Sequence, residues 1–537
     1  MKDYARKQIE ELYKVGIDIR EAESKKKGYS DGIKKTLTGL YPDNAHFVFE
    51  LLQNAEDTGA TNVDFKLTNT SLIFTHNGHR LFSKEDVDSI TNIGDSSKLD
   101  DPTKIGKFGI GFKAVFAYTM TPRIYSGDFW FEIRDLICPC PLETSRAKPL
   151  ETLFEFPFNN PQKTAIQCFA EIAAFLRGLK DNVLLFLHNI QSIGWSINER
   201  ENGGLSRERV DNNIIKILNQ NGQMEPSKSF WLRFEKDVEV TDDNGDTKDC
   251  RIAIAYSMVE AEENKKKAAA WKIVPLDHGQ VSIFFPAEKE TSNLRFHLHA
   301  PFASTVARDS VRECEANNAL RDHLSELVVE SLTSIRDMGM LTVAFLAVLP
   351  NPYDNLSNLY KPIQDAVVKA FQEQELTPTK SGDYATTSAL FTGPAKIADV
   401  LGDEGLAVIT GYDPPLWAAN PPPQHQRSEH LLESLEIDEW GWNELVESLH
   451  STGFSSSSED ELEKQELFES WVCQMKDDKL LRFYALLGEA YSPRSSDCYP
   501  LSSLRIIRVN TENADEHLKA REVFLPPVVG VSPPLGI

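Results

Sequence analysis

Long apolar segments are missing from this sequence. Its first residues, Met1–Arg6, are polar and charged, so they lack the apolar core of a secretory signal. No run reaches the roughly 18 apolar residues that a membrane span requires. The apolar stretch Leu341–Leu349 is too short and instead predicts a buried segment. The sequence therefore predicts neither a secretory signal nor a membrane span.

Cysteine is scarce and shows no ligand pattern. The 537 residues include 7 cysteines, and Cys138 and Cys140 form the one close pair. No second pair at zinc-ligand spacing accompanies them. This distribution is typical of reduced thiols rather than of a disulfide framework. We therefore predict a cytoplasmic protein without a zinc domain.

Positive charge is in deficit. The chain has 57 Lys and Arg residues against 81 Asp and Glu residues, and its formal net charge is −24. A broad surface for nucleic acid or anionic membranes would show the opposite balance. The overall charge therefore does not indicate direct nucleic-acid binding, although it leaves room for a local basic patch.

A glycine-rich stretch, residues 105–113, stands out from the rest of the chain. Gly106, Gly109 and Gly111 fall within six positions, and an apolar run follows at once. Glycine lets the backbone approach a ligand closely. A glycine loop that opens a helix directs free N–H groups and the positive end of the helix dipole at one point, which suits phosphate. Taken alone, this pattern fits a tight turn equally well.

An amphipathic helix is predicted upstream, over residues 46–57. Its polar side chains Glu50, Asn54 and Asp57 are spaced four and three residues apart, so they project from one face. A solvated stripe would explain any one of them. A predicted strand and its hairpin partner follow, before a second polar motif at His76-Asn77-Gly78.

Three motifs therefore occur in a fixed order: the helix, the His76-Asn77-Gly78 motif with Ile93-Gly94, and the glycine loop. This order resembles the GHKL ATPases, which include gyrase, the large heat-shock chaperone, histidine kinases and MutL. The resemblance covers roughly residues 45–135, and the loop is most similar to the heat-shock-chaperone and sacsin-type branches. It implies a Bergerat-type α/β sandwich that binds ATP and Mg²⁺.

The resemblance also implies roles for single residues. Glu50 would be the general base that orients the attacking water. Asn54 would ligate Mg²⁺, which takes few protein ligands, and Asp57 would lie near the adenosine. A polar segment over residues 95–103 would form a lid over ATP. The other implied nucleotide-binding residues are His76, Asn77, Gly78, Ile93, Gly94, Ser97, Lys98, Gly106, Lys107, Phe108, Gly109, Ile110, Gly111, Phe112 and Lys113.

His76 departs from the family pattern. In the family an Asp at this position accepts a proton from the adenine amino group. Neutral histidine keeps one acceptor nitrogen, so ATP remains compatible with the site. The preference between ATP and GTP is left open by this substitution.

A second α/β region is predicted beyond residue 200, where residues 199–204 are expected to form a loop. Strands are predicted on both sides of Asn244-Gly245, a strong hairpin signal. His297 and His299 fall on one strand face, and without a third ligand we interpret them as structural.

Arg308 lies in a segment, residues 300–311, that resembles the middle-domain loop of the heat-shock chaperone. The resemblance implies a catalytic arginine that stabilises the transferring phosphoryl group. Activity would then require closure of two domains. A surface ion pair with Asp309 is the alternative interpretation.

The predicted fold class is α+β. A Bergerat-type domain is followed by an α/β, transducer-like middle domain and a mainly helical C-terminal region. No nuclease, protease or transferase motif is evident in residues 350–537, and the apolar ending is compatible with a truncated effector portion. The predicted divisions are an N-terminal helical segment (1–40), the ATP-binding domain (41–200), the middle domain (201–350), a mixed region with linker (351–425) and an acidic helical region (426–537).

The predicted function is that of a Mg²⁺-dependent, slowly hydrolysing ATPase switch. Protein partners are expected, including a homodimer through the ATP-binding domain. Its output would be chaperone-like remodelling, or a sensor role in a system such as bacterial defence against phage. The alternatives are a non-hydrolysing nucleotide-binding scaffold and, with little support, no nucleotide at all. A sensor kinase is disfavoured because no histidine precedes His46, and topoisomerase or MutL function is disfavoured by the acidic charge.

Overall fold

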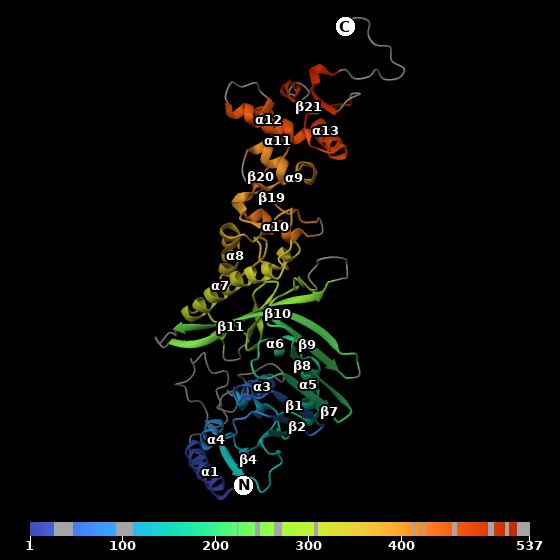
Figure 1. Ribbon diagram of the computed structural model, residues 1–537. Coiled ribbons are helices and arrows are strands. Elements are labelled where there is room, and N and C mark those ends of the chain that lie inside the picture. Colours follow the sequence, from blue (N-terminus) through green and yellow to red (C-terminus); the bar gives the residue numbers. More distant parts are fainter. Residues whose placement is uncertain are drawn as a thin grey trace. The chain divides into compact units, whose positions relative to one another are not determined.

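Figure 1 shows the computed structural model as a ribbon. The chain divides into two compact units. The first comprises Met1–Ser334, Val348–Pro350 and Asp354–Ala366, and the second comprises Ile335–Ala347, Asn351–Tyr353 and Val367–Ile537. The structure describes residues 1–25, 47–92, 111–222, 224–241, 247–261, 271–305, 310–411, 415–422, 425–453, 459–491, 499–510 and 515–523.

One large mixed sheet organises the first unit. Among the described residues it contains 15 strands, in the order β14-β13-β15-β11-β10-β9-β8-β7-β1-β2-β6-β3-β4-β5, with β12 beside β11. The strands are β1 (Asn62–Leu67), β2 (Ser71–His76), β3 (Arg123–Ser126), β4 (Phe129–Arg134), β5 (Cys138–Pro141), β6 (Thr152–Pro157), β7 (Ser192–Ile197), β8 (Glu201–Arg209), β9 (Ile214–Asn221), β10 (Ser227–Thr241), β11 (Thr247–Glu260), β12 (Trp271–Val274), β13 (Gln280–Ile283), β14 (Phe285–Thr291) and β15 (His297–His299).

The hairpin of β1 and β2 lies at the centre of the part that carries the predicted nucleotide motifs. Phe65 pairs with Phe74 across the antiparallel hairpin and with Trp195 of the parallel neighbour β7. Alternate residues of β2 are buried, which places His76 on the same inward face as Phe74. The last residue of β2 is therefore a polar side chain at the edge of the hydrophobic core.

Helices pack on this sheet through aromatic contacts. Phe47 of α3 lies 4.8 Å from the ring of Tyr118 and 6.1 Å from that of Phe156, measured between ring centroids. Helix α4 (Lys84–Thr91) begins after Ser83, which forms a reciprocal capping box with Asp86. The helices that include first-unit residues are α1 (Asp3–Ser24), α3 (Phe47–Asp57), α4 (Lys84–Thr91), η2 (Phe112–Ala117), α5 (Ala165–Arg177), α6 (Asn182–Leu185), α7 (Glu315–Asp337), η3 (Phe345–Val348) and α8 (Lys361–Glu373).

The sheet continues without a break past residue 200. The prediction of a loop over residues 199–204 was wrong, because β8 begins at Glu201 and pairs with Ile197 of β7. Asn198 and Glu199 adopt positive φ angles of 51° and 56°, so the chain reverses in a tight turn. The division into domains at 41–200 and 201–350 stays a prediction.

The second unit is mainly helical, as predicted for the C-terminal region. Its core includes Trp417, Trp440, Phe468 and Trp471, and Trp440 is buried among them. The remaining helices are α9 (Ala395–Thr410), α10 (Gln426–Ser434), α11 (Trp442–Gly453), α12 (Glu459–Cys473), α13 (Asp477–Tyr491), η4 (Thr387–Ala389), η5 (Tyr499–Ser503) and η6 (Ala520–Glu522). The small strands are β16 (Thr377–Pro378), β17 (Tyr384–Ala385), β18 (Leu390–Thr392), β19 (Leu416–Trp417), β20 (Asp438–Glu439), β21 (Arg505–Asn510) and β22 (Asp515–Lys519).

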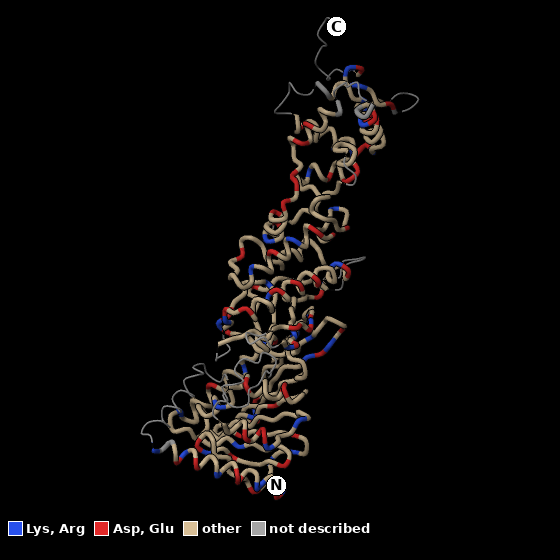
Figure 2. Tube along the Cα trace, turned by 90° about the vertical axis from the view of Figure 1, so that its left-hand side faces the viewer, with Lys and Arg blue, Asp and Glu red and all other residues tan. Residues whose placement is uncertain are grey.

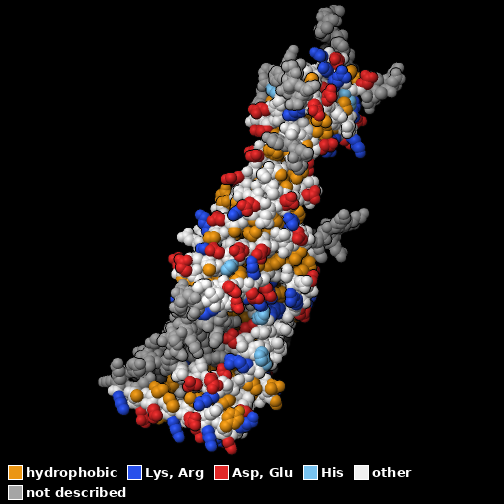
Figure 3. All heavy atoms as spheres, turned by 60° about the vertical axis from the view of Figure 1, so that its left-hand side comes forward, with side chains coloured by type: hydrophobic (Ala, Val, Ile, Leu, Met, Phe, Trp, Pro, Cys, Tyr) orange, Lys and Arg blue, Asp and Glu red, His pale blue; other side chains and the backbone are white. Residues whose placement is uncertain are grey.

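Acidic and basic residues are distributed along the trace of both units (Figure 2). On the face shown in Figure 3, the described acidic and basic side chains are interspersed rather than separated into broad patches. Within the described part of the chain, no helix combines the length and hydrophobicity needed to cross a membrane.

Candidate nucleotide-binding site

The carboxylate of Glu50 lies against the backbone of Gly111. Glu50 is buried on α3, with 4% of its surface exposed. A Cβ atom added to Gly111 would lie only 2.0 Å from Oε2 of Glu50. Gly111 has an ordinary φ of −62°, so glycine is required here for space and not for backbone conformation. The structure thus brings the predicted base into contact with the end of the glycine loop.

Asn54 follows Glu50 by one helical turn on the same face of α3. It is also 4% exposed, whereas Asp57 is exposed at the end of the helix. Glu50 and Asn54 therefore present a carboxylate and an amide from one buried helix face. Asp57 does not share this buried face, because its side chain is exposed to solvent.

His76 is enclosed by aromatic rings and by the end of α3. Its ring lies 5.8 Å from that of Phe74 and 6.2 Å from that of Phe154. Burial lowers the pKa of His76 to about 4, so the ring is neutral at pH 7. The Gly78 backbone N–H donates to Nδ1 over 3.2 Å. A Cβ on Gly78 would lie 1.9 Å from Oγ1 of Thr58, so only glycine fits at this position.

Asn77 is engaged within the fold. Its Oδ1 accepts hydrogen bonds from the backbone N–H groups of Thr61 and Asn62, both over 2.9 Å. Its Nδ2 donates to Oγ1 of Thr61 over 2.8 Å. These bonds fasten the end of β2 to the start of β1. The predicted role of Asn77 in nucleotide binding stays a prediction.

Lys113 is turned into the protein interior. Only 1% of it is exposed, and Nζ donates to the carbonyl oxygens of Ile90 (2.8 Å) and Leu136 (2.5 Å). Burial lowers the pKa of Lys113 to about 7. The neighbouring Phe112 packs on Phe154. The start of η2 is thus anchored to the end of α4 and to the turn after β4, a contact that the sequence did not reveal.

Several predicted site residues lie outside the described residues, and their roles stay predictions. They are Ile93, Gly94, Ser97, Lys98, Gly106, Lys107, Phe108, Gly109, Ile110 and Arg308.

Glu56 is a positioning residue that sequence reasoning missed. Its Oε1 accepts the backbone N–H groups of His188 and Asn189, both over 2.6 Å, and its Oε2 accepts that of Ile190 over 2.9 Å. The carboxylate therefore fixes α3 to the segment before β7. No local signal distinguishes Glu56 from Asp57, which is the exposed one of the two.

Two arginines pack on the carbonyl end of α6. Arg207 donates to the backbone oxygens of Leu184 (2.9 Å) and Leu187, and Arg233 donates to that of Leu185 (3.0 Å). Burial, followed by the nearby Arg233, lowers the pKa of Arg207 to about 10. Both residues line a cavity of about 570 Å³ that also contains carboxylates, among them Glu235. These guanidinium groups are used to cap the helix, which favours a structural role.

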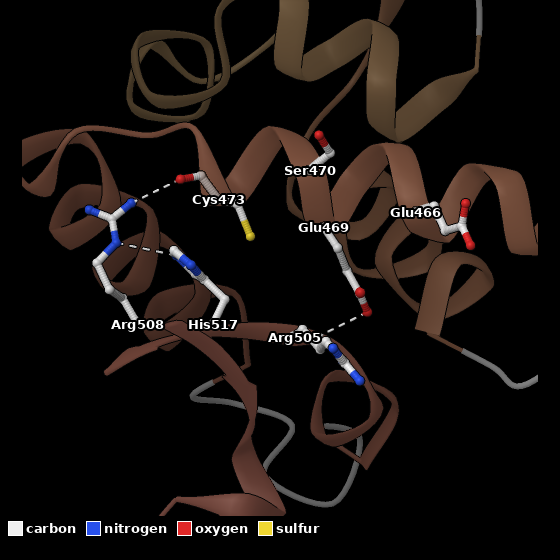
Figure 4. Close-up of a pocket in the computed structure, with 7 residues that line it drawn as sticks. All are labelled: Glu466, Glu469, Ser470, Cys473, Arg505, Arg508 and His517. Carbon is white, nitrogen blue, oxygen red and sulfur yellow. Dashed lines mark hydrogen bonds between the residues drawn. The ribbon is translucent and has the colours of Figure 1, made fainter. Parts of the chain in front are cut away.

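The second unit contains an open cavity of about 600 Å³ between α12 and the β21–β22 hairpin (Figure 4). Arg508 donates to the backbone oxygens of Cys473 (3.2 Å) and Met475 (2.5 Å) and pairs with Asp477 at 2.6 Å. Burial raises the pKa of the Cys473 thiol, so the thiol is protonated at pH 7 and is a poor nucleophile. We therefore assign this cavity no catalytic role.

The two histidines of β15 are buried, and their interpretation as structural stays a prediction. His297 accepts the backbone N–H of Gln280 over 2.8 Å and stacks on Trp231, and His299 stacks on Phe186. Within the described ranges, no group of three or more His, Cys, Asp or Glu side chains is placed to hold a metal ion.

Comparison with known proteins gives matches of limited extent. Residues 66–150 match the family described as SACS, Sacsin domain. Protein NO VEIN of Arabidopsis thaliana is 25% identical over 334 residues, which cover 56% of this chain and 12% of that protein. Human sacsin is 37% identical over 111 residues, which cover 18% of this chain and 2% of that protein. The chain therefore spans only a small part of the length of these relatives.

A solved structure, the B-subunit of the DNA gyrase from Myxococcus xanthus, is 11% identical and has a TM-score of 0.33. The alignment covers 57% of this chain and 96% of that chain. The segment matched by the Sacsin domain contains His76, Gly111 and Lys113, and it begins inside β1, so α3 lies outside it.

Proposed function

We propose that this sacsin-like GHKL protein is a Mg²⁺-dependent ATPase that binds ATP beside α3 and hydrolyses it slowly. The observation that supports this proposal most directly is the contact between Glu50 and Gly111. It joins two sequence motifs that are about 60 residues apart and that the family resemblance assigns to one site.

The residues present fit a nucleotide and a magnesium ion. Because Gly111 has no side chain, the Glu50 carboxylate can lie directly against the backbone at the end of the glycine loop. The Asn54 amide lies one turn away on the same buried face. A carboxylate and an amide are oxygen donors, which suit a hard cation that retains water and phosphate ligands.

In the proposed mechanism, Glu50 orients the attacking water and accepts its proton. The amide oxygen of Asn54 would hold Mg²⁺, and the bound ion would supply positive charge to the phosphate oxygens. The buried position of Glu50 on a helix packed by Phe47 and Phe49 limits its movement and keeps the base at a fixed place. Arg308 is proposed as the residue that stabilises charge on the transferring phosphoryl group.

The test is to measure phosphate release and nucleotide binding separately. Glu50→Gln should abolish turnover and retain binding of Mg-ATP, and Asn54→Ala should lose the Mg²⁺-dependent part of binding. Glu85→Gln makes the same chemical change at an exposed position of α4 and should leave both quantities unchanged. Equal turnover by wild type and Glu50→Gln would remove Glu50 as the base.

The alternative function is that of a nucleotide-binding scaffold without turnover. The departure at His76 is the feature that favours it. Wild-type protein that binds Mg-ATP and releases no phosphate, also when protein concentration is raised to promote dimers, would replace the ATPase proposal with the scaffold. A chaperone-like or defence-related output, and a homodimer through the ATP-binding part, are further proposals that rest on nucleotide turnover.

A further inference from the structure

Three arginines lie on one face of the large sheet. Arg207 and Arg209 are two positions apart on β8, so their side chains leave the same face of the sheet. Ile215 of β9 pairs with Arg209 and also with Trp231 of β10, which places all three on that face. Arg233 follows Trp231 by two positions on β10. The pairing register therefore gathers the three guanidinium groups over three neighbouring strands.

The same three arginines line the cavity of about 570 Å³ described above. Among the described residues that line it, neither Glu50 nor Asn54 occurs, so this cavity is separate from the proposed nucleotide site. Its volume lies within the range of roughly 300–1,000 Å³ that small-molecule sites occupy. Besides the charged groups, its lining includes three amide side chains and one apolar side chain, those of Gln191, Asn212, Asn213 and Ile215.

The carboxylates at or near this cavity are engaged by other groups. Oε2 of Glu235 lies 3.0 Å from Nη2 of Arg233, and Glu208 pairs with Lys216 at 2.9 Å. The nearby Glu56 accepts three backbone N–H groups. Within the described ranges, Arg233 is therefore the one member of the three arginines that has a carboxylate partner.

Arg207 and Arg209 bond to backbone oxygens instead. Arg209 donates to the carbonyl oxygen of Asn212 through both Nε and Nη2. Arg207 donates to three carbonyl oxygens at the end of α6 and just beyond it, those of Leu184, Leu187 and His188. A neutral acceptor does not cancel a formal charge. In the part of the chain that the structure describes, two positive charges at this cavity thus have no counter-ion.

These backbone contacts take up only part of each guanidinium group, which has five N–H donors. The bonds of Arg207 come from Nη1 and Nη2, so its Nε–H has no acceptor among the described residues. The bonds of Arg209 likewise leave Nη1 without one. Arginine presents its N–H groups as a planar fork that matches two oxygens of a phosphate group. The remaining donors and the uncompensated charge therefore suit a phosphate-bearing ligand.

We propose that this cavity binds a small organic phosphate, whose phosphate oxygens contact Arg207 and Arg209. The amide side chains of the lining supply hydrogen-bond donors and acceptors for the polar organic part of the ligand. A nucleic-acid strand is the less suitable occupant, because it requires basic contacts well beyond one cavity and the chain carries a net charge of −24. The proposal is independent of nucleotide turnover at Glu50.

The experiment is calorimetric titration of the full chain with pyrophosphate, ribose 5-phosphate and ribose, in EDTA so that no Mg²⁺ is present. We expect both phosphates to bind and ribose not to bind, with an affinity that falls as salt is added. Arg209→Gln removes one exposed charge and should weaken the binding of both phosphates about tenfold or more. Arg200→Gln makes the same change at an exposed arginine just before β8 and should keep the wild-type affinity.

A second variant, Arg207→Lys, keeps the positive charge and removes the planar fork, so it should also weaken the binding of both phosphates. Circular dichroism checks that each variant is folded. Wild-type protein that binds neither phosphate would overturn the proposal, as would one affinity shared by wild type, Arg209→Gln and Arg207→Lys. An oligonucleotide that binds through Arg209 while both small phosphates fail to bind would replace the proposed ligand with a nucleic acid. The ATPase proposal is unaffected by any of these outcomes, because it is tested by phosphate release.

Discussion

The side chain of Glu50 and the backbone of Gly111 occupy adjoining space, so that a single methyl group on Gly111 would fall 2.0 Å from the Glu50 carboxylate. Glu50 comes from a helix and Gly111 from the end of a glycine loop. Their contact makes the position of the proposed base dependent on a residue that has no side chain.

Gly111→Ala should therefore displace the Glu50 carboxylate. We expect phosphate release to fall by at least about tenfold, because a base that moves by 1 Å loses its alignment with water. Gly488→Ala is the matched control, since a Cβ there would meet nothing within 4 Å. Circular dichroism should show both variants folded. Full turnover by Gly111→Ala would contradict the proposed position of the base.

Lys113 should make the unfolding free energy of the first unit increase as the pH is raised above about 7. The folded-state pKa is about 7, against 10.5 for an ordinary lysine, so between these values the unfolded chain binds a proton that the folded chain lacks. The free energy of unfolding therefore rises as the pH increases from about 7 toward 10.5. Below about pH 7 the full cost of burying the charged amine lowers it.

Lys113→Met should remove that dependence. The unfolding free energy of wild type should rise relative to that of the variant by up to about 1.4 kcal/mol per pH unit between pH 7 and 10. Denaturant unfolding at several pH values measures this difference. The exposed Lys66→Met substitution should leave the wild-type slope unaltered, and an identical slope in Lys113→Met would show that Lys113 is not buried as a neutral amine.

Three buried histidines should lower the unfolding free energy of the same unit at acidic pH. Burial lowers the pKa values of His76, His297 and His299 to about 4 each, from 6.5. Between pH 6.5 and 4 the unfolded state binds protons that the folded state does not, so stability is full above 6.5 and falls as the pH drops. Each histidine contributes a slope of up to about 1.4 kcal/mol per pH unit.

His299→Gln should lower this acid slope by the contribution of one histidine, although it also weakens the stacking with Phe186. Urea unfolding at pH 5 and 7 gives the slope. The exposed His278→Gln substitution serves as the control. Slopes that coincide for wild type and His299→Gln would mean that His299 is protonated in the folded state.

Glu56→Gln should loosen the attachment of α3 to the segment before β7. The carboxylate accepts three backbone N–H groups, and glutamine offers one oxygen and no charge. We expect a loss of unfolding free energy of roughly 1–3 kcal/mol, measured by urea denaturation beside Glu85→Gln. A loss no larger than that of Glu85→Gln would contradict the role of Glu56.

Local signals were sufficient for much of the fold. The helix over Phe47–Asp57, the β1–β2 hairpin and the capping box at Ser83 follow from residues within a few positions of one another. The antiparallel pairing of β10 and β11 was likewise predicted from a local signal, the Asn-Gly pair between the two strands. Periodicity and capping depend on short-range geometry, so they can be recognised in one sequence.

The turn before β8 shows where local signals misled. Polar and glycine residues over 199–204 resemble a loop, but Gly203 and Gly204 lie inside β8, in contact with β7 and β9. Added Cβ atoms would lie 2.4 Å from the Trp195 ring at Gly203 and 2.3 Å from the Ile193 oxygen at Gly204. Glycine serves close packing in this strand, which only the neighbouring strands reveal.

The sequence by itself determined the family resemblance, the identity of the residues expected to act on a nucleotide and the α+β character of the chain. Motif order and hydrophobic periodicity depend only on the order of residues, so a single sequence is sufficient to recognise them. Tertiary structure alone decided that Lys113 faces carbonyl oxygens, that Glu56 rather than Asp57 is buried, and that His76 lies between aromatic rings with Nδ1 beside the Gly78 backbone N–H. Each of these depends on burial or on partners that folding brings close, and burial and hydrogen bonding set both the protonation state and the direction of a polar side chain.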